Sequence, residues 1–249
     1  MYRFFIQAQQ VNDDTLTITG EDVNHIKNVL RMKMGEQLEA VDEDRFLYLC
    51  KIDSLDEEGV HCQILDRKKP ETELPNPVTL YMGLTKSDKP DFVIQKAVEL
   101  GAVRIVPVTT RRTVVKLDAK KAAARQKRWQ TIAEAAAKQS KRAVIPEVGA
   151  IMPFEEAVKE AAASDVLLIP YEQETGIART RDILRDILRG IRRGESVAAF
   201  IGPEGGFEPS EVELVKSCGG KSITLGRRIL RAETAAVTML SILMYELDE

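Results

Sequence analysis

The chain has 249 residues, of which 44% are hydrophobic and 30% charged, and its formal net charge is −3. This composition is typical of soluble globular proteins, and the length suffices for one large core or two unequal domains. No apolar run reaches the roughly 18 residues that a membrane span requires, and the start becomes polar after Ile6, unlike a secretory signal. We therefore expect a cytoplasmic protein without a membrane anchor.

Cysteine and histidine are too scarce and too scattered to predict a metal site. Cys50, Cys62 and Cys218 form no CxxC pair, which favours reduced thiols over disulfides or zinc ligands. The two histidines, His25 and His61, lie in different predicted elements, so a histidine-rich metal centre is not expected. For each histidine, a surface or packing role is favoured over proton transfer.

Short alternating or apolar segments dominate the first seventy residues, and turns rich in Asp, Glu and Gly separate them. The predicted strands are 2–6, 15–19, 37–42, 46–52 and 60–65. One short helix is expected from Glu21 to Met32, with Asp22 as its N-cap. We interpret residues 1–72 as a small β-barrel carrying one helix, and the proline-rich segment 70–77 as a linker.

From Val78 onward, predicted strands alternate with predicted helices. The strands are 78–84, 104–109, 166–170, 197–201 and 222–225, and the helices are about 90–101, 118–142, 178–193 and 232–247, with two more starting at Pro153 and Pro209. Ser210 and Glu213 read as a capping box for the helix at Pro209, which Gly219 and Gly220 should end. Repeated strand–helix units predict a mostly parallel sheet covered on both faces.

A basic block lies between Arg111 and Arg142, opposed only by Asp118 and Glu134. Its cations are Arg111, Arg112, Lys116, Lys120, Lys121, Arg125, Lys127, Arg128, Lys138, Lys141 and Arg142. Such a block on an acidic chain is typical of a polyanion-binding face. The alternative is an ordinary solvated helix surface, although the block lacks the acidic partners that i,i+4 pairing would supply.

Three loops should meet at one edge of the predicted sheet, because each follows the carboxyl end of a strand. They are 169–175, 201–206 and 225–231. In the second loop, Gly205 and Gly206 carry no Cβ and allow close approach of a ligand to the backbone. The loop has Glu204 but no Lys at the position that a phosphate loop requires. We therefore expect a shared pocket for a ligand without phosphates, and a cationic ligand would suit it.

Several other classes of site are not supported. The turn after strand 78–84, GLTKSDKPD, lacks the GxGxxG of a Rossmann cofactor site. The chain has no GxSxG, and no histidine is placed to serve a Ser or Cys nucleophile, which argues against a hydrolase.

Charged residues in the three loops allow both a functional and a structural interpretation. Arg231 lies between a glycine loop and a helix start. It is either a surface cation or a residue that binds an anionic or carbonyl-bearing substrate. Glu233 and Thr234 either act in the pocket or cap the last helix. Glu204 either serves the ligand or closes its own turn.

These strings resemble the SPOUT class of methyltransferases and, within it, the ribosomal RNA small subunit methyltransferase E family. The most specific matches are 201–206, Leu225-Gly226 and 229–235. Further matches along essentially the whole chain are Arg3-Phe4-Phe5, 25–31, 86–89, 95–101, Arg128-Trp129, Glu134, Gln139-Ser140 and Arg142. The sequence departs from the family at Asp91-Phe92-Val93, where a stretch with methionine and tryptophan is more usual.

The resemblance implies a PUA-like, RNA-binding β-barrel at 1–72 and a SPOUT methyltransferase domain at 73–249, whose C-terminal segment is tied into a trefoil knot. It implies that the three loops hold S-adenosylmethionine, which is positively charged at sulfur and has no phosphate, and that the protein is a homodimer. The cofactor residues so implied are Leu168, Ile169, Pro170, Tyr171, Glu172, Ile201, Gly202, Pro203, Glu204, Gly205, Gly206, Leu225, Gly226, Ile229, Leu230, Arg231, Thr234 and Ala235.

The implied reaction is methylation of N3 of a uridine in 16S ribosomal RNA of the small subunit, without a metal. Arg231 would stabilise charge on a uracil carbonyl, and Glu204 and Glu233 are both candidates for accepting the N3 proton. The expected RNA contacts are Arg3, His25, Lys27, Arg31, Lys86, Arg111, Arg112, Arg128 and Arg142. Two alternatives remain: a ribosome-assembly protein on a SPOUT scaffold without enzymatic activity, and a SPOUT 2′-O-methyltransferase acting on transfer RNA.

Overall fold

The computed structural model describes residues 1–174 and 177–248. The chain divides into two compact units. The first consists of Met1–Glu73 with Ala137–Val144, and the second of Leu74–Ala136 with Ile145–Glu249. The segment that ends the basic block therefore belongs to the N-terminal unit, although it follows that unit in sequence by more than sixty residues.

The first unit is built on one sheet with the strand order β1-β4-β5-β6-β3-β2. Its strands are β1 (Arg3–Phe5), β2 (Val11–Asn12), β3 (Thr15–Ile18), β4 (Gln37–Val41), β5 (Leu47–Leu55) and β6 (Val60–Lys68). β1 pairs with β4 in parallel, and the other neighbours are antiparallel. Alternate residues such as Leu38, Cys50, Ile52 and Val60 are buried in one core, as expected for strands with one covered face.

The predicted helix from Glu21 to Met32 is wrong in its length and in its cap. The structure has a short α1 (Glu21–Asn24) that continues as a π-helical turn, η2 (His25–Val29), after Gly20 at φ 76°. Asp22 is not the N-cap, because its carboxylate accepts a hydrogen bond from Lys138 Nζ at 2.6 Å. A tertiary ion pair within this unit thus decides where the Asp22 side chain points.

The second unit contains a sheet of parallel strands, with the order β10-β8-β7-β12-β11-β13 and β9 also paired to β8. The strands are β7 (Val78–Gly83), β8 (Ala102–Thr109), β9 (Glu147–Val148), β10 (Met152–Pro153), β11 (Val166–Pro170), β12 (Val197–Ile201) and β13 (Lys221–Ile223). The predicted α/β architecture is confirmed. Because β7, β12, β11 and β13 are parallel neighbours, their carboxyl ends lie at one edge.

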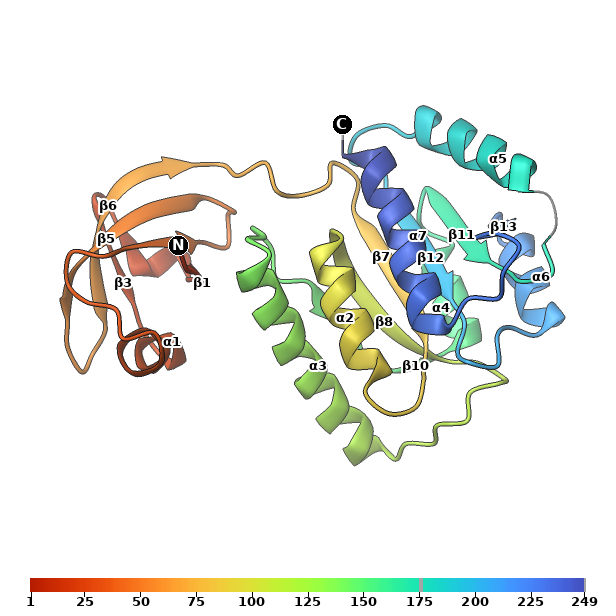
Figure 1. Ribbon diagram of the computed structural model, residues 1–249, viewed down its shortest axis with the longest axis horizontal. Helices are drawn as coiled ribbons and strands as arrows, with labels where there is room; N and C mark the ends of the chain where they lie inside the picture. The colour runs from red at the N-terminus through yellow and green to blue at the C-terminus, as the bar shows by residue number, and fades with distance from the viewer. Residues whose placement is uncertain (175–176, 249) are drawn as a thin grey trace. The chain divides into compact units, whose positions relative to one another are not determined.

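Helices cover both faces of this sheet. They are α2 (Lys89–Glu99), α3 (Ala119–Gln139), α4 (Phe154–Ala161), α5 (Ile177–Gly190), α6 (Pro209–Ser217) and α7 (Ala232–Leu247). Tyr81 and Phe200 stack at 4.7 Å between ring centroids and pack with Phe154 of α4 and Val212 of α6 in one cluster. Alternate strand residues point to the opposite face, and α7 packs against α2 and β12 (Figure 1).

Two predicted helix ends and one predicted cap need correction. α5 ends at Gly190 rather than at 193. α3 ends at Gln139 rather than at 142, and Lys141 has φ 57°, which a right-handed helix does not allow. In α6 the capping box is formed by Glu208 and Glu211, not by Ser210 and Glu213. The helix begins at Pro209, and the buried Glu211 carboxylate also accepts the backbone N–H of Arg111 at 2.9 Å.

Candidate functional site

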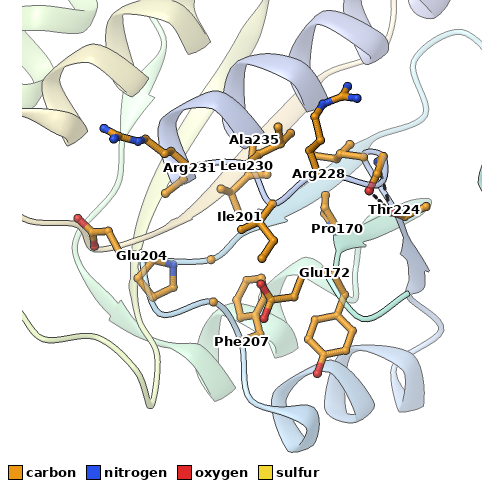
Figure 2. A pocket seen from close by; sticks show the side chains of 18 of the residues that line it. Pro170, Glu172, Ile201, Glu204, Phe207, Thr224, Arg228, Leu230, Arg231 and Ala235 are labelled. Carbon is orange, nitrogen blue, oxygen red and sulfur yellow. Dashed lines mark hydrogen bonds between the residues drawn. The ribbon is translucent and has the colours of Figure 1, made fainter. Parts of the chain in front are cut away.

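The three predicted loops line one cavity of about 390 Å³ at the carboxyl edge of the sheet. Figure 2 shows the side chains around it. Its walls are formed by Lys89, Pro170, Tyr171, Glu172, Ile201, Gly202, Pro203, Glu204, Gly206, Phe207, Thr224, Leu225, Gly226, Arg228, Ile229, Leu230, Arg231, Ala232 and Ala235. The volume and the mixture of apolar walls with a few charged groups are typical of a small-molecule site.

Four of the expected cofactor residues do not line this cavity. Leu168 and Ile169 are fully buried within β11, where they pack between sheet and helices, while Gly205 and the exposed Thr234 lie outside the wall. Thr175, the last residue of the first loop, is outside the described residues.

Sequence reasoning missed five lining residues: Lys89, Phe207, Thr224, Arg228 and Ala232. Four of them are neighbours of predicted residues along the loops. Lys89 is different, because it starts α2 and reaches the cavity from the loop after β7, a fourth strand end. Because β7 pairs with β12 in parallel, the loop after β7 ends at the same edge of the sheet, and this pairing could have predicted the position of Lys89.

The loop after β12 is a tight turn that requires glycine. The N–H of Gly206 donates to the carbonyl of Pro203 at 2.9 Å, and Gly206 has φ 67°. A Cβ at Gly202 would lie 3.3 Å from Gly206 Cα. The turn therefore folds closely on itself and presents backbone rather than side chain to the cavity.

The loop after β13 is held by hydroxyl groups. The N–H of Thr224 donates to Thr180 Oγ1 on α5 at 3.0 Å, and the Thr224 hydroxyl donates to the carbonyl of Gly226 at 3.1 Å. The N–H of Tyr171 donates to the carbonyl of Ile223 at 2.9 Å, which ties the first loop to β13. These bonds fix two of the three loops before any ligand binds.

Glu204 is the best-connected carboxylate at the cavity. Its Oε1 atom accepts hydrogen bonds from Lys89 Nζ at 3.0 Å and from the backbone N–H of Lys86 at 3.2 Å. Partial burial by itself would raise the pKa of Glu204, but the hydrogen bonds from its own amide, from Lys89 and from Lys86 outweigh this effect and lower it. Glu204 is therefore ionised at neutral pH.

The start of α7 brings two further candidates close to Glu204. Arg231 is the N-cap residue of α7 and is exposed, and it makes no side-chain cap hydrogen bond. Glu233 lies in the first turn, where a negative charge stabilises the helix, and its Oε2 lies 3.7 Å from Lys89 Nζ. Arg231 and Glu204 lie on the same side of the cavity in Figure 2, and Arg228 lies on the other.

Two of the expected RNA contacts are buried, contrary to expectation. Arg142, only 3% exposed, forms an ion pair with Glu73, and the 6% exposed Arg3 pairs with Glu39 at 2.9 Å. Both guanidinium groups therefore form ion pairs within the first unit and are shielded from solvent.

The other expected RNA contacts are at least partly exposed. They are His25, Lys27, Arg31, Lys86, Arg111, Arg112 and Arg128. Four of them also have protein partners: Lys27 Nζ donates to the carbonyl of Asp56 at 2.7 Å, Arg128 pairs with Asp91, Arg111 pairs with Glu208, and Arg112 donates to the loop after β12. Among residues 1–174 and 177–248, we find no group of three or more His, Cys, Asp or Glu suited to a metal ion, and no helix long and apolar enough to cross a membrane.

Comparison with known proteins assigns the family. Residues 72–244 match the RNA methyltransferase domain family, and residues 18–65 match the RNA methyltransferase PUA domain family. The ribosomal RNA small subunit methyltransferase E of Bacillus subtilis is 36% identical over 251 residues, covering 100% of this chain and 98% of that protein. The protein of the same name from Mesomycoplasma hyopneumoniae is 33% identical and covers 97% and 98%.

A solved structure gives the same result. The ribosomal RNA small subunit methyltransferase E of Neisseria gonorrhoeae, bound to S-adenosyl methionine, superposes with a TM-score of 0.81 at 29% identity, covering 98% of this chain and 96% of that one. The predicted resemblance is confirmed over both units. The chain belongs to the ribosomal RNA small subunit methyltransferase E family.

Proposed function

We propose that this protein transfers a methyl group from S-adenosylmethionine to N3 of a uridine in 16S ribosomal RNA. The observation that carries the proposal is that the loops after β11, β12 and β13 share one cavity in a member of this family. In the proposal, residues 1–72 contribute to RNA binding and residues 73–249 carry out catalysis.

The lining of the cavity fits this cofactor. Ile201, Leu225 and Leu230 offer apolar surface for an adenine ring, and the turn at Gly202 and Gly206 leaves backbone polar groups within reach. The ionised Glu204 suits a ligand that carries positive charge. When bound, the cofactor supplies an electrophilic methyl carbon with a neutral leaving group, so the protein's tasks are alignment and the handling of one proton.

The residues at the start of α7 are suited to the acceptor base. Uracil N3–H is a poor nucleophile until it loses its proton, and Glu204 and Glu233 are the candidate acceptors. The exposed guanidinium of Arg231 would stabilise negative charge on a uracil carbonyl. Its position at the cavity rim leaves it accessible to RNA.

Calorimetric titration with S-adenosylmethionine and mass mapping of 16S RNA methylated in vitro test the function. Arg231→Ala should abolish methylation and leave cofactor affinity nearly unchanged, since the stabilised charge develops only during the reaction. Arg227→Ala, a change in an exposed arginine outside the cavity wall, is the matched control. Turnover that survives Arg231→Ala would contradict the assigned role. Absence of cofactor binding would favour the scaffold alternative, and a ribose-methylated product the 2′-O alternative.

RNA binding is expected to depend on the exposed basic side chains, including Lys120, Lys121 and Lys127 of α3. Each phosphate contact releases counterions, so affinity should fall steeply as salt is added. The uridine must leave its stack to reach the cavity. Replacing these three lysines by alanine should reduce the salt slope, and a flat response of the unchanged protein would refute the assignment.

Three further parts of the proposal concern the assembly, the knot and the location. We infer a homodimer, supported by the exposed apolar side chains of Ile229 and Tyr245, which are 85% and 79% exposed at the two ends of the α7 region. Light scattering coupled to gel filtration tests the oligomeric state.

The trefoil knot is supported by the return of the chain from β13, at the sheet edge, to α7 beside α2. A ribosomal RNA substrate would place the protein in the cytoplasm.

A further inference from the structure

Lys89 joins three of the elements that surround the cavity. It is the first residue of α2, and its ammonium lies 3.0 Å from Glu204 Oε1 in the loop after β12. The same ammonium lies 3.7 Å from Glu233 Oε2 at the start of α7. The side chains of Lys89, Glu204 and Glu233 are 31%, 38% and 20% exposed, so the cluster is partly shielded from water.

The two carboxylates differ in what else binds them. Glu204 Oε1 also accepts the N–H of Lys86. Among the described residues, Glu233 Oε2 is buried without a hydrogen-bond partner, and the Lys89 ammonium is the cation that pairs with it. Two carboxylates that share a site without a cation cannot both ionise readily, and one of them takes up a proton at a raised pKa.

We propose that Lys89 is a positioning residue of the methyl-transfer site, whose ammonium holds the carboxylates of Glu204, in the cavity wall, and Glu233, beside it, together and balances their charge. The assignment to methyl transfer rests on the proposed function, whereas the ion cluster is a property of the protein alone. With Lys89 the cluster carries a net charge of about −1, which suits a cationic ligand. Without Lys89 the two carboxylates would repel each other, which favours protonation of one of them.

Other charged groups around the cluster do not replace Lys89. Arg228 and Arg231 lie in the loop before α7, Glu172 in the loop after β11, and Lys86 and Asp88 in the loop before α2. All of these side chains are exposed. Among the ion pairs of the described residues, Lys89 is the cation that pairs with both carboxylates. Solvent screens the exposed groups more strongly.

Carbon-13 NMR of the glutamate carboxyl groups tests the cluster in the protein without cofactor. The Glu204 and Glu233 signals are assigned with Glu204→Gln and Glu233→Gln and followed with pH in the unchanged protein, in Lys89→Met and in Lys89→Arg. In the unchanged protein, Glu204 should titrate below its ordinary range. Lys89→Met should move the titration of at least one of the two signals to higher pH, and Lys89→Arg should restore it. Identical titration curves in all three proteins would overturn the proposal.

Lys96→Met is the matched control, because Lys96 lies on the same helix, is also 31% exposed and pairs with Glu99 at 2.8 Å. It should leave the Glu204 and Glu233 signals unchanged. Circular dichroism of each variant separates a loss of charge from a loss of fold. If Lys89→Met does not fold, Lys89→Gln provides the same comparison.

The pH dependence of methylation is the second measurement. Lys89→Met should move the acidic limb of the kcat profile to higher pH, and Lys89→Arg should restore it, whereas a purely structural role would lower kcat at all pH values alike. If the unchanged protein fails to bind S-adenosylmethionine, the proposed function fails while the NMR titration still decides the role of Lys89. If the unchanged protein methylates RNA and Lys89→Met has the same pH profile, the Lys89 proposal alone is refuted.

Discussion

Arg112 anchors the glycine turn of the cavity, because its Nη1 donates a hydrogen bond to the carbonyl oxygen of Gly205 at 2.9 Å. A Cβ at Gly205 would lie 3.0 Å from Arg112 Cβ, so the two residues are also in close packing contact. The sequence placed Arg112 among the RNA contacts. The structure shows a second use for this side chain, namely holding the turn between β12 and α6 against the end of β8.

Arg112→Ala should therefore weaken cofactor binding. An exposed hydrogen bond of this kind contributes at most about 1 kcal/mol, so the dissociation constant for S-adenosylmethionine should rise by up to about fivefold. Arg111→Ala is the control, because the Arg111 side chain pairs with Glu208 at 3.5 Å and does not contact the turn. Calorimetry that shows equal effects for both variants would contradict the anchoring role.

Gly83→Ala should destabilise the second unit strongly. A Cβ at Gly83 would lie 2.4 Å from the backbone nitrogen of Pro203, and backbone on both sides of the contact leaves little room to relax. Such overpacking costs about 1–3 kcal/mol or more. Urea denaturation measures the free energy of unfolding, with Gly190→Ala as the control, since a Cβ there meets open space at the end of α5. Comparable urea midpoints for the two variants would show that the backbone at Gly83 and Pro203 moves apart to accommodate the added methyl group.

Arg142→Ala should lower the free energy of unfolding more than it lowers the affinity for RNA. The buried Arg142 guanidinium pairs with Glu73, whose Oε1 also accepts the N–H of Ala143 at 2.8 Å. Removing one partner of a buried ion pair costs about 3–5 kcal/mol, because the other charge stays buried. Lys121→Ala, at a side chain 71% exposed, should cost less than about 0.5 kcal/mol. Thermal denaturation compares the two, and an Arg142→Ala protein of normal stability would return this residue to the RNA-binding set.

The three thiols should differ sharply in reactivity. Burial raises the pKa of Cys50 and of Cys62 from 9.0 to about 12, while Cys218 is exposed. At pH 8 a thiol reagent should modify Cys218 quickly and the two buried cysteines of the first unit only through unfolding. The fast phase should disappear in Cys218→Ser. If it persists there, the sheet of the first unit opens more readily than its packing indicates.

The same raised pKa values give a pH dependence of stability. The folded state favours the neutral thiols, so their contribution is fully present below about pH 9, the ordinary thiol pKa, and is lost as the pH rises toward 12. The urea midpoint should therefore fall between pH 8 and pH 10.5, and Cys50→Ala should reduce that fall. A midpoint that does not change across this range would contradict the assignment.

The sequence by itself determined the parallel α/β sheet and the three loops of the cavity. Strand–helix alternation after Val78 and the glycines at 202–206 are local patterns, and parallel strands necessarily bring their carboxyl ends to one edge. The loops could be predicted for that reason without any knowledge of long-range contacts. The family resemblance then supplied the ligand that the residues alone had left open.

Only the tertiary structure decided how individual charged side chains are used. Asp22 and Arg142 were expected to be a helix cap and an RNA contact, yet each pairs with a residue far away in sequence. Lys89 was overlooked for the same reason, since its place beside Glu204 and Glu233 depends on β7 lying next to β12. Periodicity fixes the face on which a residue lies, but the partner of a charge depends on which elements the fold brings within about 4 Å of it.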